Sequence, residues 1–451
     1  MFELREYQKE AITAFQANNQ SGIFDMATGT GKTITSLFAA NEAFKKNNRQ
    51  FLVIIVPFLH LIEQWAKDFS LLGIDYYLEI AYSKSHWSSK LADLVWDYNY
   101  RYRERVVIIG SYKSMANPDF QTQMAEISGD RFLIADECHY LGSSQSRKNN
   151  FLSFEAKLGL SATPRRWWDE EGTTAINKLF EKIVYSFPME EAIEKKILTN
   201  YLYHPIVTDL TEEEISVYQE ISLKISRLMG IKPLTKDLEE RLKRLTMQRA
   251  TLLQNAENKK GQLSSLISKQ EDKRHTLVYC GKGQVDELVE MIADLGIRVH
   301  RFNSEINFKD REKILQQFSN GEIEVLVAIK CLDEGVDVPS TRVAYFMAST
   351  SNPREFIQRR GRVLRRSAGK SLSVVYDFVV LPKQSELASE VFASIATKEM
   401  PRFAEFSQFA LNQYKARNVV MPYLKKYHLD SLMDILPWEM YEKIKQEGVY
   451  L

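Results

Sequence analysis

The chain has 451 residues, and a single hydrophobic core rarely grows beyond about 250–300 residues, so we expect two or three domains. Its composition, 44% hydrophobic and 26% charged, is ordinary for a folded protein and excludes disordered and collagen-like classes. Lys and Arg together number 60 and Asp and Glu 59, a net charge of +1. Overall charge therefore neither favours nor excludes a nucleic-acid partner.

The cysteines and the apolar pattern predict an intracellular protein. Cys138, Cys280 and Cys331 are odd in number and widely spaced, so they indicate neither a disulfide framework nor a paired-cysteine metal site. No apolar run approaches the roughly 18 to 20 residues of a membrane span, and the N-terminal segment carries charges where a signal peptide is apolar. We therefore expect a cytoplasmic protein without a membrane partner.

Two series of short apolar runs predict an α/β fold with two parallel sheets. Longer helical segments separate the runs, a pattern typical of strands that are buried on both faces and joined by helices. The first series occupies residues 22–26, 51–56, 105–110, 131–136 and 156–161, and the second occupies 275–280, 297–302, 324–329, 342–347 and 372–378.

Helical patterns separate and follow these two series. Apolar residues between the series recur at three- and four-residue spacing among charges, and Thr211 followed by Glu214 has the spacing of a capping box. Helical, aromatic-rich sequence returns after the second series. The predicted organisation is an α/β domain at 1–207, a helical linker or insertion at 208–272, a second α/β domain at 273–381 and a helical C-terminal extension at 382–451.

The segment "MATGTGKT", which begins at Met26, lies between a predicted strand and a predicted helix. Gly29 and Gly31 allow a tight turn whose backbone N–H groups point at an anion near a helix N-terminus. In such a loop Lys32 reaches the β- and γ-phosphates and the Thr33 hydroxyl binds Mg²⁺. Met26 replaces the glycine that usually begins this pattern, so a glycine-rich turn that only caps a helix is the alternative.

The segment "FLIADECHY" ends a predicted strand with four chemically active side chains. One interpretation is a paired-carboxylate site, in which Asp136 holds Mg²⁺ and Glu137 activates a water molecule. The other is a zinc site held by Cys138 and His139. Structural zinc needs about four such ligands at recurring spacings, and only two adjacent ones occur here. We therefore favour the carboxylate pair, next to the phosphate loop.

Together these motifs resemble those of the superfamily 2 helicases and translocases. "MATGTGKT" resembles the family's phosphate loop and "DECH" its motif II, and the resemblance follows the family's order over most of residues 3–380. The other matching segments are "LREYQKEAI", "VPFLHLIEQW", "GSYKS", "SATP", "LVYC", "AIKCLDEGVDVP" and "QRRGRVLR". The resemblance implies two RecA-like domains, with ATP and Mg²⁺ bound in the cleft between them.

The resemblance also implies roles for individual residues. The implied catalytic residues are Lys32, Asp136, Glu137, Arg362 and Arg365, the two arginines acting as arginine fingers. The implied Mg²⁺ ligands are Thr33 and Asp136. The implied ATP-binding residues are Arg5, Gln8, Thr28, Gly29, Thr30, Gly31, Lys32, Thr33, Gly335, Asp337, Gln358 and Arg359. Those that couple hydrolysis to movement are His139, Ser161 and Thr163, and those that contact nucleic acid are His60, Ser111, Tyr112 and Lys113.

Several departures from the RNA-helicase pattern favour DNA as the polymer. "VPFLHLIEQW" lacks the Arg-Glu-Leu signature of DEAD-box RNA helicases, and "QRRGRVLR" differs from their His-Arg-x-Gly-Arg motif. The early "LREYQ", the "GVDVP" segment and the helical stretch between the α/β domains look like DNA translocases of the XPB or restriction-helicase type. We expect an ATP-dependent DNA helicase or translocase. The alternatives are an RNA helicase or remodeller, and an ATP-gated DNA clamp or motor subunit of a repair or phage-defence complex.

Four segments have open alternatives. "YNYRYRER" at 98–105 and "RRWW" at 165–168 combine cations with rings, as single-strand binding requires, but such rings also pack against a sheet beneath arginine stems. The basic run 354–370 is either part of the ATP site or a surface helix. The helices of 208–272 either contact DNA, form a solvated linker or provide a docking site for a protein partner. The C-terminal helices are a second candidate docking site.

Overall fold

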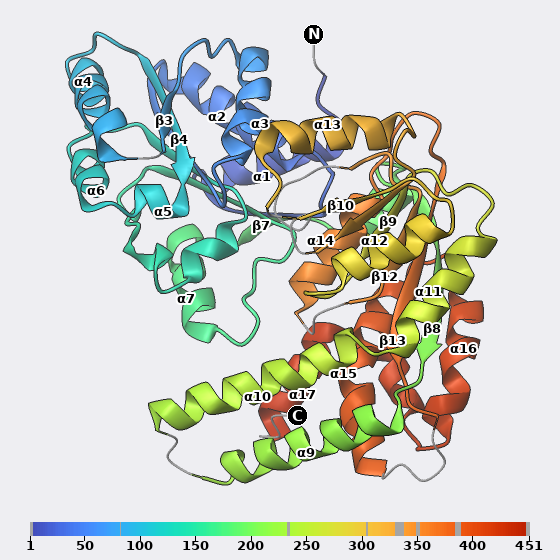
Figure 1. The fold of residues 1–451 in the computed structure, drawn as a ribbon. Helices are drawn as coiled ribbons and strands as arrows, with labels where there is room; N and C mark the ends of the chain where they lie inside the picture. The colour runs from blue at the N-terminus through green and yellow to red at the C-terminus, as the bar shows by residue number, and fades with distance from the viewer. Residues whose placement is uncertain are drawn as a thin grey trace. The chain divides into compact units, whose positions relative to one another are not determined.

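A computed structural model describes residues 3–81, 83–231, 235–303, 305–329, 338–348, 352–383 and 389–447. The chain divides between Leu198 and Thr199 into two units, and Figure 1 traces it from the blue N-terminus to the red C-terminus. Gly335 and Asp337, for which we expected a role in nucleotide binding, lie outside the described residues.

The first unit is built on a parallel seven-stranded sheet with the order β3-β4-β2-β5-β6-β1-β7. β2 is buried along its whole length, as an unbroken apolar run predicts for a central parallel strand. The predicted strands are confirmed, and the pattern missed only the edge strands β3 and β7. The strands are β1 (Ser21–Met26), β2 (Gln50–Val56), β3 (Leu78–Ile80), β4 (Arg105–Ser111), β5 (Arg131–Ala135), β6 (Ala156–Ser161) and β7 (Ile183–Phe187).

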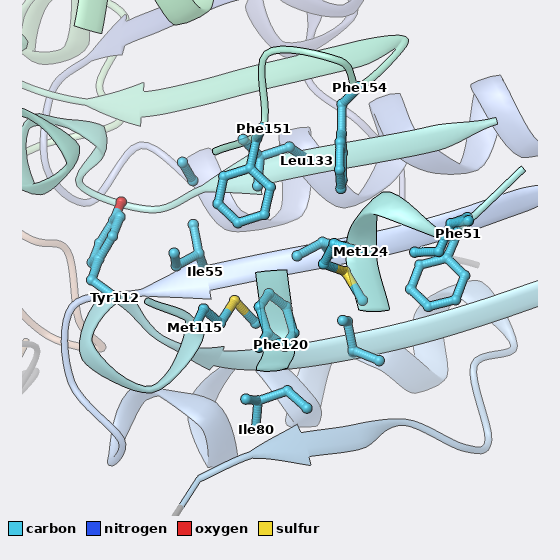
Figure 2. Packing of buried hydrophobic residues seen from close by; sticks show 14 of the residues in the cluster. Phe51, Ile55, Ile80, Tyr112, Met115, Phe120, Met124, Leu133, Phe151 and Phe154 are labelled. Carbon is cyan, nitrogen blue, oxygen red and sulfur yellow. The ribbon is translucent and has the colours of Figure 1, made fainter. Parts of the chain in front are cut away.

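Helices and a large hydrophobic core support this sheet. Phe51, Ile55 and Leu133 on β2 and β5 share the core with Phe120 and Met124 (Figure 2), and all five are at most 2% exposed. This burial stabilises the unit and fixes the strand ends that carry the site. The helices are α1 (Glu6–Ala17), α2 (Lys32–Asn47), α3 (Leu61–Phe69), α4 (Ser88–Asn99), α5 (Tyr112–Met115), α6 (Pro118–Ala125), α7 (Glu170–Phe180) and α8 (Met189–Glu194), with a short 3₁₀ turn, η3 (Cys138–Gly142).

The second unit contains a parallel six-stranded sheet with the order β10-β11-β9-β12-β13-β8. Two wholly parallel sheets flanked by helices confirm the predicted α/β class. The strands are β8 (Asn200–Thr208), β9 (Thr276–Tyr279), β10 (Val299–Phe302), β11 (Val325–Ala328), β12 (Val343–Phe346) and β13 (Leu372–Val380). The helices are α9 (Glu212–Met229), α10 (Lys236–Gln254), α11 (Asn258–Lys269), α12 (Val285–Asp294), α13 (Phe308–Ser319), α14 (Pro353–Val363), α15 (Ser389–Ser407), α16 (Gln413–Lys425) and α17 (Pro437–Glu447). Among the described residues, no helix is both long and apolar enough to span a bilayer.

β8 corrects the predicted boundary of the first domain at residue 207. This strand pairs with β13 from end to end, with Asn200 opposite Leu372 and Thr208 opposite Val380, so it belongs to the second sheet. This strand was not identified from the sequence, and a run of residues does not reveal which sheet it joins. The division at Leu198 therefore assigns the last residues of the predicted first domain to the second unit.

The predicted helical segment at 208–272 is helical, but only α9 and α10 project from the second unit. α11 packs on the sheet through Leu263 and Ile267, which are fully buried in the core that also holds β9 and β11. α9 and α10 lie side by side as an antiparallel pair (Figure 1). The capping box is present at the start of α9: the Glu214 N–H donates to Thr211 Oγ1 at 3.2 Å, and the Thr211 N–H donates to Glu214 Oε2 at 2.8 Å.

The C-terminal helices are an integral part of the second unit. Arg402 on α15 is buried and its Nε donates to both carboxylate oxygens of Asp377 on β13, at 3.1 and 3.0 Å. One of its terminal nitrogens donates to Glu399 Oε2 at 2.8 Å, and the Tyr203 hydroxyl on β8 donates to Asp377 Oδ2 at 2.9 Å. Buried charges are tolerated when they are paired and hydrogen-bonded. This cluster, which we call the α15 anchor, joins α15 to the sheet.

The loop between α15 and α16 covers part of the outer edge of β8. The Leu411 N–H donates to the Tyr201 carbonyl at 3.0 Å. The Asn412 side chain accepts from the Tyr203 N–H at 2.8 Å and donates to the Tyr203 carbonyl at 2.9 Å. These bonds satisfy backbone groups that an edge strand otherwise exposes.

Candidate functional site

The predicted phosphate loop connects β1 to α2. β1 ends at Met26 and α2 begins at Lys32. Between them Gly29 and Gly31 have φ angles of +89° and +82°, in the region that favours glycine. A side chain at Gly31 would also place its Cβ 2.9 Å from Gln8 Nε2. The turn and its two glycines therefore lie where the sequence predicts them.

Hydrogen bonds within the first unit hold this loop. The Tyr7 hydroxyl donates to the Thr30 carbonyl at 2.6 Å, and the Thr30 hydroxyl donates to the Ala27 carbonyl at 2.7 Å. The Lys32 ammonium donates at 2.9 Å to the carbonyl of the last residue of β1. Thr28 Oγ1 is buried and has no hydrogen-bond partner within the described part of the chain. A buried hydroxyl of this kind is costly unless a ligand satisfies it, so the loop fits a bound phosphate.

Gln8 and Arg5 lie beside the loop at the start of α1. The Gln8 side chain is buried, accepts from the Arg5 N–H at 3.0 Å and donates to Thr35 Oγ1 on α2 at 3.0 Å. The Tyr7 ring stacks on Phe187 with a centroid distance of 4.1 Å, which holds α1 against the sheet. The segment expected to read adenine is therefore fixed next to the segment expected to bind phosphate.

The acid pair directly follows β5. The Asp136 N–H donates to the Ile55 carbonyl on β2 at 2.8 Å, so the sheet pairing continues to this residue. Asp136 Oδ2 accepts from the Trp65 indole at 3.2 Å, Oδ1 accepts from the Glu137 N–H at 3.0 Å, and its carbonyl accepts from the Tyr112 hydroxyl at 2.6 Å. The backbone and the carboxylate of Asp136 are both held in place.

Lys32 lies near two partly buried carboxylates. Burial and the like charge of Glu137 raise the pKa of Asp136 to about 6, and Lys32 acts in the opposite direction. Burial likewise raises the pKa of Asp25 on β1 to about 6, again opposed by Lys32. A divalent cation would relieve the cost of ionising Asp136 here. The carboxylate of Asp136 and the hydroxyl of Thr33 are the oxygen ligands that Mg²⁺ prefers.

Glu137 begins the turn η3, which carries His139. Glu137 has a φ of +46°, a strained conformation for a residue with a side chain. His139 is buried, with Nδ1 3.3 Å from Glu137 Oε2 and 3.4 Å from Ser161 Oγ. Ser161 Oγ in turn accepts from the Thr163 N–H at 3.1 Å. The structure thus brings the three predicted coupling residues together with Glu137.

The geometry does not support the zinc alternative for "DECH". Cys138 is buried with Sγ against Gly159, where an added Cβ would lie 3.0 Å from it. His139 turns its Nδ1 toward Glu137 instead. Within the described ranges, no three His, Cys, Asp or Glu side chains are grouped so that they could hold a metal ion. Cys138 therefore fills space in the core.

A groove of about 710 Å³ lies at the ends of β2 and β4 and includes the predicted nucleic-acid residues Ser111 and Lys113. Its other lining residues are Pro57, Phe58, Leu59, Lys84, Trp87, Ser114, Ala116, Asn117, Gln145 and Lys148. Lys113 and Lys148 are exposed, and Lys84 forms an ion pair of 2.5 Å with Asp119. Cationic and polar side chains of this kind suit the phosphates of a nucleic-acid backbone.

Aromatic rings connect this groove to the acid pair. Phe58 lines the groove, stacks on His60 at 5.7 Å and meets the Tyr140 ring at 5.9 Å. Tyr140 lies 5.8 Å from Tyr112 and 4.7 Å from His139. Tyr112 is only 3% exposed. The ring is therefore buried and supports the acid pair, and the contact of Tyr112 with nucleic acid stays a prediction.

α14 of the second unit carries the "QRRGRVLR" arginines. Gln358, Arg359 and Arg362 are at most 9% exposed, which rules out a simple basic surface helix. Arg359 donates to the Ala348 carbonyl at 3.0 Å. Gln358 and Arg362 have i, i+4 spacing, so they lie on one side of the helix. Arg365, the second predicted arginine finger, follows just beyond the end of α14 at Val363.

Two family models match this chain. The model described as "Type III restriction enzyme, res subunit" matches residues 1–166, and "Helicase conserved C-terminal domain" matches residues 258–367. The chain is also 26% identical over 396 residues to DNA 3'-5' translocase XPB2 of Sulfurisphaera tokodaii, a match that covers 82% of this chain and 81% of that protein. The chain belongs to helicase superfamily 2. It is thus a nucleic-acid-dependent enzyme that hydrolyses ATP.

Solved structures confirm the tandem RecA-like fold of this superfamily 2 member. The ATP-dependent Type ISP restriction-modification enzyme LlaBIII bound to DNA matches with a TM-score of 0.62 and 15% identity, covering 96% of this chain but only 33% of the larger one. The helicase domain of Pyrococcus furiosus Hef matches with a TM-score of 0.51 and 17% identity, covering 84% of this chain and 95% of that domain.

Sequence reasoning missed several residues of this superfamily 2 site. Trp65 and Asp25 contact or face the acid pair and Lys32, and each lies in or directly beside a recognised motif. Arg166, expected as a candidate for nucleic acid, turns inward instead: one terminal nitrogen donates to the His139 carbonyl at 2.7 Å and its Nε to Asp169 Oδ2 at 2.6 Å. It ties the segment after "SATP" to η3.

The "YNYRYRER" stretch was expected either to bind a single strand at the surface or to pack against the sheet, and its residues do not all lie in the same environment. Tyr98 is buried beneath the Arg49 guanidinium, which lies 4.2 Å from the ring centroid. Trp96, Tyr100 and Tyr102 are exposed, and the Trp96 and Tyr102 rings stack at 5.3 Å. Part of this stretch therefore belongs to the core and part to the surface.

Proposed function

We propose that the chain is an ATP-dependent DNA translocase or helicase that hydrolyses ATP in the cleft between its two RecA-like domains. The observation that carries the proposal is the grouping, in the first unit, of the glycine loop, Lys32 and the partly buried pair Asp136 and Glu137, linked through rings to a basic groove. This arrangement can bind a nucleotide and transmit its state to a polymer-binding surface.

The phosphate loop would bind ATP through its backbone N–H groups and the N-terminus of α2, with Lys32 on the β- and γ-phosphates. Thr33 and Asp136 would hold Mg²⁺. When bound, Mg²⁺ supplies positive charge that stabilises the charge developing on the transferred phosphoryl group. Asp136 needs little reorganisation for this role, because Trp65 and Tyr112 already fix its carboxylate and backbone. Gln8 and Arg5 would contact the adenine.

Glu137 would orient the attacking water and accept its proton. His139 Nδ1 lies beside the Glu137 carboxylate and beside Ser161, so a change at the carboxylate reaches the segment that contains Thr163. The contact between the His139 and Tyr140 rings carries the same change toward the groove. These contacts would couple hydrolysis to nucleic-acid binding.

Arg362 and Arg365 would neutralise the γ-phosphate in the transition state, a role worth roughly 10³ to 10⁵ in rate. They belong to the second unit, whereas Glu137 belongs to the first. Turnover would therefore require a particular arrangement of the two domains. Gln358 and Arg359 would line the same site.

DNA is the polymer that we propose. The relative XPB2 is named as a DNA 3'-5' translocase and LlaBIII was solved bound to DNA. The chain also lacks the RNA-helicase signatures of its motifs. The groove would grip DNA mainly through phosphates by way of Lys113, with His60 and Ser111 as neighbours, so binding should tolerate sequence and weaken with salt.

The first experiment measures the ATPase rate with single-stranded DNA, duplex DNA and RNA of equal length, at two salt concentrations. We expect DNA to stimulate turnover more than RNA does, and higher salt to reduce the stimulation. Glu137→Gln should abolish turnover while fluorescent ATP still binds. Equal or greater stimulation by RNA would contradict the assignment of the polymer, and wild-type turnover in Glu137→Gln would contradict the catalytic role.

A second experiment tests movement separately from hydrolysis. ATP-dependent displacement of a third strand from a triplex requires translocation along the duplex. We expect displacement by the wild-type chain and none by Glu137→Gln. Hydrolysis without displacement would leave an ATP-gated clamp as the function.

A further inference from the structure

Arg360 on α14 is held by elements that neither family model covers. β8 and α15 lie outside residues 1–166 and 258–367. The Arg360 side chain is 1% exposed, and its terminal nitrogens donate to Glu405 Oε1 on α15 at 2.6 Å, to the Glu405 carbonyl, and to the Tyr201 hydroxyl on β8 at 3.4 Å. Within the "QRRGRVLR" motif, Arg359 therefore contacts Ala348, whereas its neighbour Arg360 contacts α15 and β8.

Aromatic rings enclose this ion pair. The Arg360 guanidinium lies 5.1 Å from the centroid of the Phe406 ring, and the Tyr201 hydroxyl donates to the Phe406 carbonyl at 2.8 Å. A buried guanidinium tolerates few positions, because leaving a charge unpaired away from water is expensive. The pair therefore fixes where Arg360 lies.

The end of α14 is also held. The last carbonyls of a helix lack partners within the helix. Here the Val363 carbonyl accepts from Lys370 Nζ and from Ser373 Oγ, the latter at 3.1 Å, and the Leu364 carbonyl accepts from the Thr199 N–H at 2.8 Å. These bonds fix the position of α14 along its axis.

The Arg360 pair instead fixes how α14 is turned about its axis. An α-helix has 3.6 residues per turn, so side chains two positions apart point in nearly opposite directions. Arg360 and Arg362 have this spacing. With Arg360 held toward α15, Arg362 is directed to the other side of the helix, and Arg365 follows just beyond the helix end. α15 is itself fixed to the sheet by the α15 anchor, so Glu405 is a firm attachment point.

We propose that Glu405 is a positioning residue for ATP hydrolysis, which through Arg360 sets the orientation of Arg362 and Arg365. The inference rests on the proposed function of those two arginines. It places α15, which lies outside the matched helicase segments, among the elements that determine the turnover rate.

The test compares Glu405→Gln with the double variant Arg360→Met/Glu405→Leu. The double variant removes both charges and retains volume, a change that buried pairs often tolerate without loss of stability. We expect kcat to fall about tenfold or more in each, while KM for ATP and DNA affinity stay within about twofold. Adding Arg362→Ala to the double variant should reduce kcat no further than Arg362→Ala alone, because both changes disable the same arginine. Asp434→Asn is the matched control: it removes an acid of the C-terminal region that pairs with Arg417, at 2.7 Å, and should leave kcat unchanged.

Three outcomes would overturn the positioning role. They are wild-type kcat in a folded variant, a loss of kcat only in proportion to lost ATP affinity, and a kcat of the combined variant that lies below that of Arg362→Ala alone. Failure of the proposed function would look different, because Glu137→Gln would then hydrolyse ATP at the wild-type rate. If Glu405→Gln does not fold, the double variant decides.

Discussion

The acid-bearing site of the first unit and the arginine-bearing helix α14 of the second unit are held in place in different ways. In the first unit, the loop at Gly31 and the acid pair are held by backbone conformation and by short hydrogen bonds from neighbouring strands. In the second unit, α14 depends on Arg360 and on Glu405, a residue 45 positions away in the sequence. In the first unit the supporting partner Trp65 itself lies within a recognised motif. In the second unit the partner of Arg360, Glu405, lies outside every recognised motif.

Replacing Arg362 gives the largest effect and tests the second region. We expect Arg362→Ala to reduce kcat by about 10³-fold, as for other arginine fingers, while the protein still binds ATP. Steady-state ATPase assays with fluorescent-nucleotide binding measure both. Arg417→Ala, which removes an arginine of the same unit from its pair with Asp434, is the control. Turnover within tenfold of the wild type would show that α14 does not supply the transition-state charge.

A change in the loop tests the first region. In Gly31→Ala the methyl group would meet Gln8 and occupy a backbone conformation that alanine avoids, so we expect ATP affinity to fall at least tenfold. Gly129→Ala is the matched control, since Gly129 has a similar φ of +74° but open space around an added Cβ. Equal loss of ATP affinity in both variants would mean that backbone strain anywhere in the unit, and not the loop, is responsible.

Asp136→Asn separates stability from activity in the first region. The pKa of Asp136 in the folded protein, about 6, lies above its ordinary value of 3.8, so ionising this carboxyl lowers the stability of the fold. The full loss of stability applies above about pH 6, and there is none below about pH 3.8. Asparagine carries no charge at any pH. We therefore expect the variant to be the more stable protein above pH 6, by on the order of 3 kcal/mol, with the difference vanishing toward pH 4. Its Mg²⁺-dependent ATPase should be lost.

Calorimetric melting of both proteins between pH 4 and pH 8 provides the measurement. A stability difference that stays constant with pH would show that Asp136 is not buried as a charge. The result would also indicate whether the first region, like many sites built for function, sacrifices stability for a preorganised carboxylate.

The smallest expected effect lies outside both regions. Thr211→Ala removes the cap of α9 and should cost about 1 kcal/mol, seen as faster hydrogen exchange in the first turn of that helix. ATPase activity should be unchanged, because Thr211 contacts neither the loop nor α14. A loss of turnover would indicate that the α9 and α10 pair also supports catalysis.

The sequence predicts the first region better than the second for a physical reason. In the proposed site, Gly29, Gly31 and Lys32 would contact the ligand through their own backbone or a single side chain, so their spacing in the sequence is enough to identify them. The burial of the Tyr112 ring was not predicted, because residue type cannot tell whether a ring at a strand end turns into the core or toward the groove. The ion pair of Arg360 and Glu405 joins segments far apart in the chain, and no local pattern encodes it.

Some features of the fold were likewise predictable from the sequence and others were not. Unbroken apolar runs identified both sheets, since strands buried on two faces must be apolar throughout. The assignment of β8 failed because sheet membership is set by pairing with β13, which only the folded chain reveals. The helical C-terminal residues were recognised as helices, but the buried charges of Arg402 and Asp377 that make α15 part of the sheet's support were not.

The loop that covers β8 has a practical consequence for anyone who shortens this chain. A truncation at the end of β13 looks reasonable from the helicase motifs alone. It would remove Leu411 and Asn412 and leave the backbone of Tyr201 and Tyr203 available to a strand from another molecule. Such a fragment should accumulate as aggregates during expression, so the shortest manageable form of this motor includes residues well beyond its last recognisable motif.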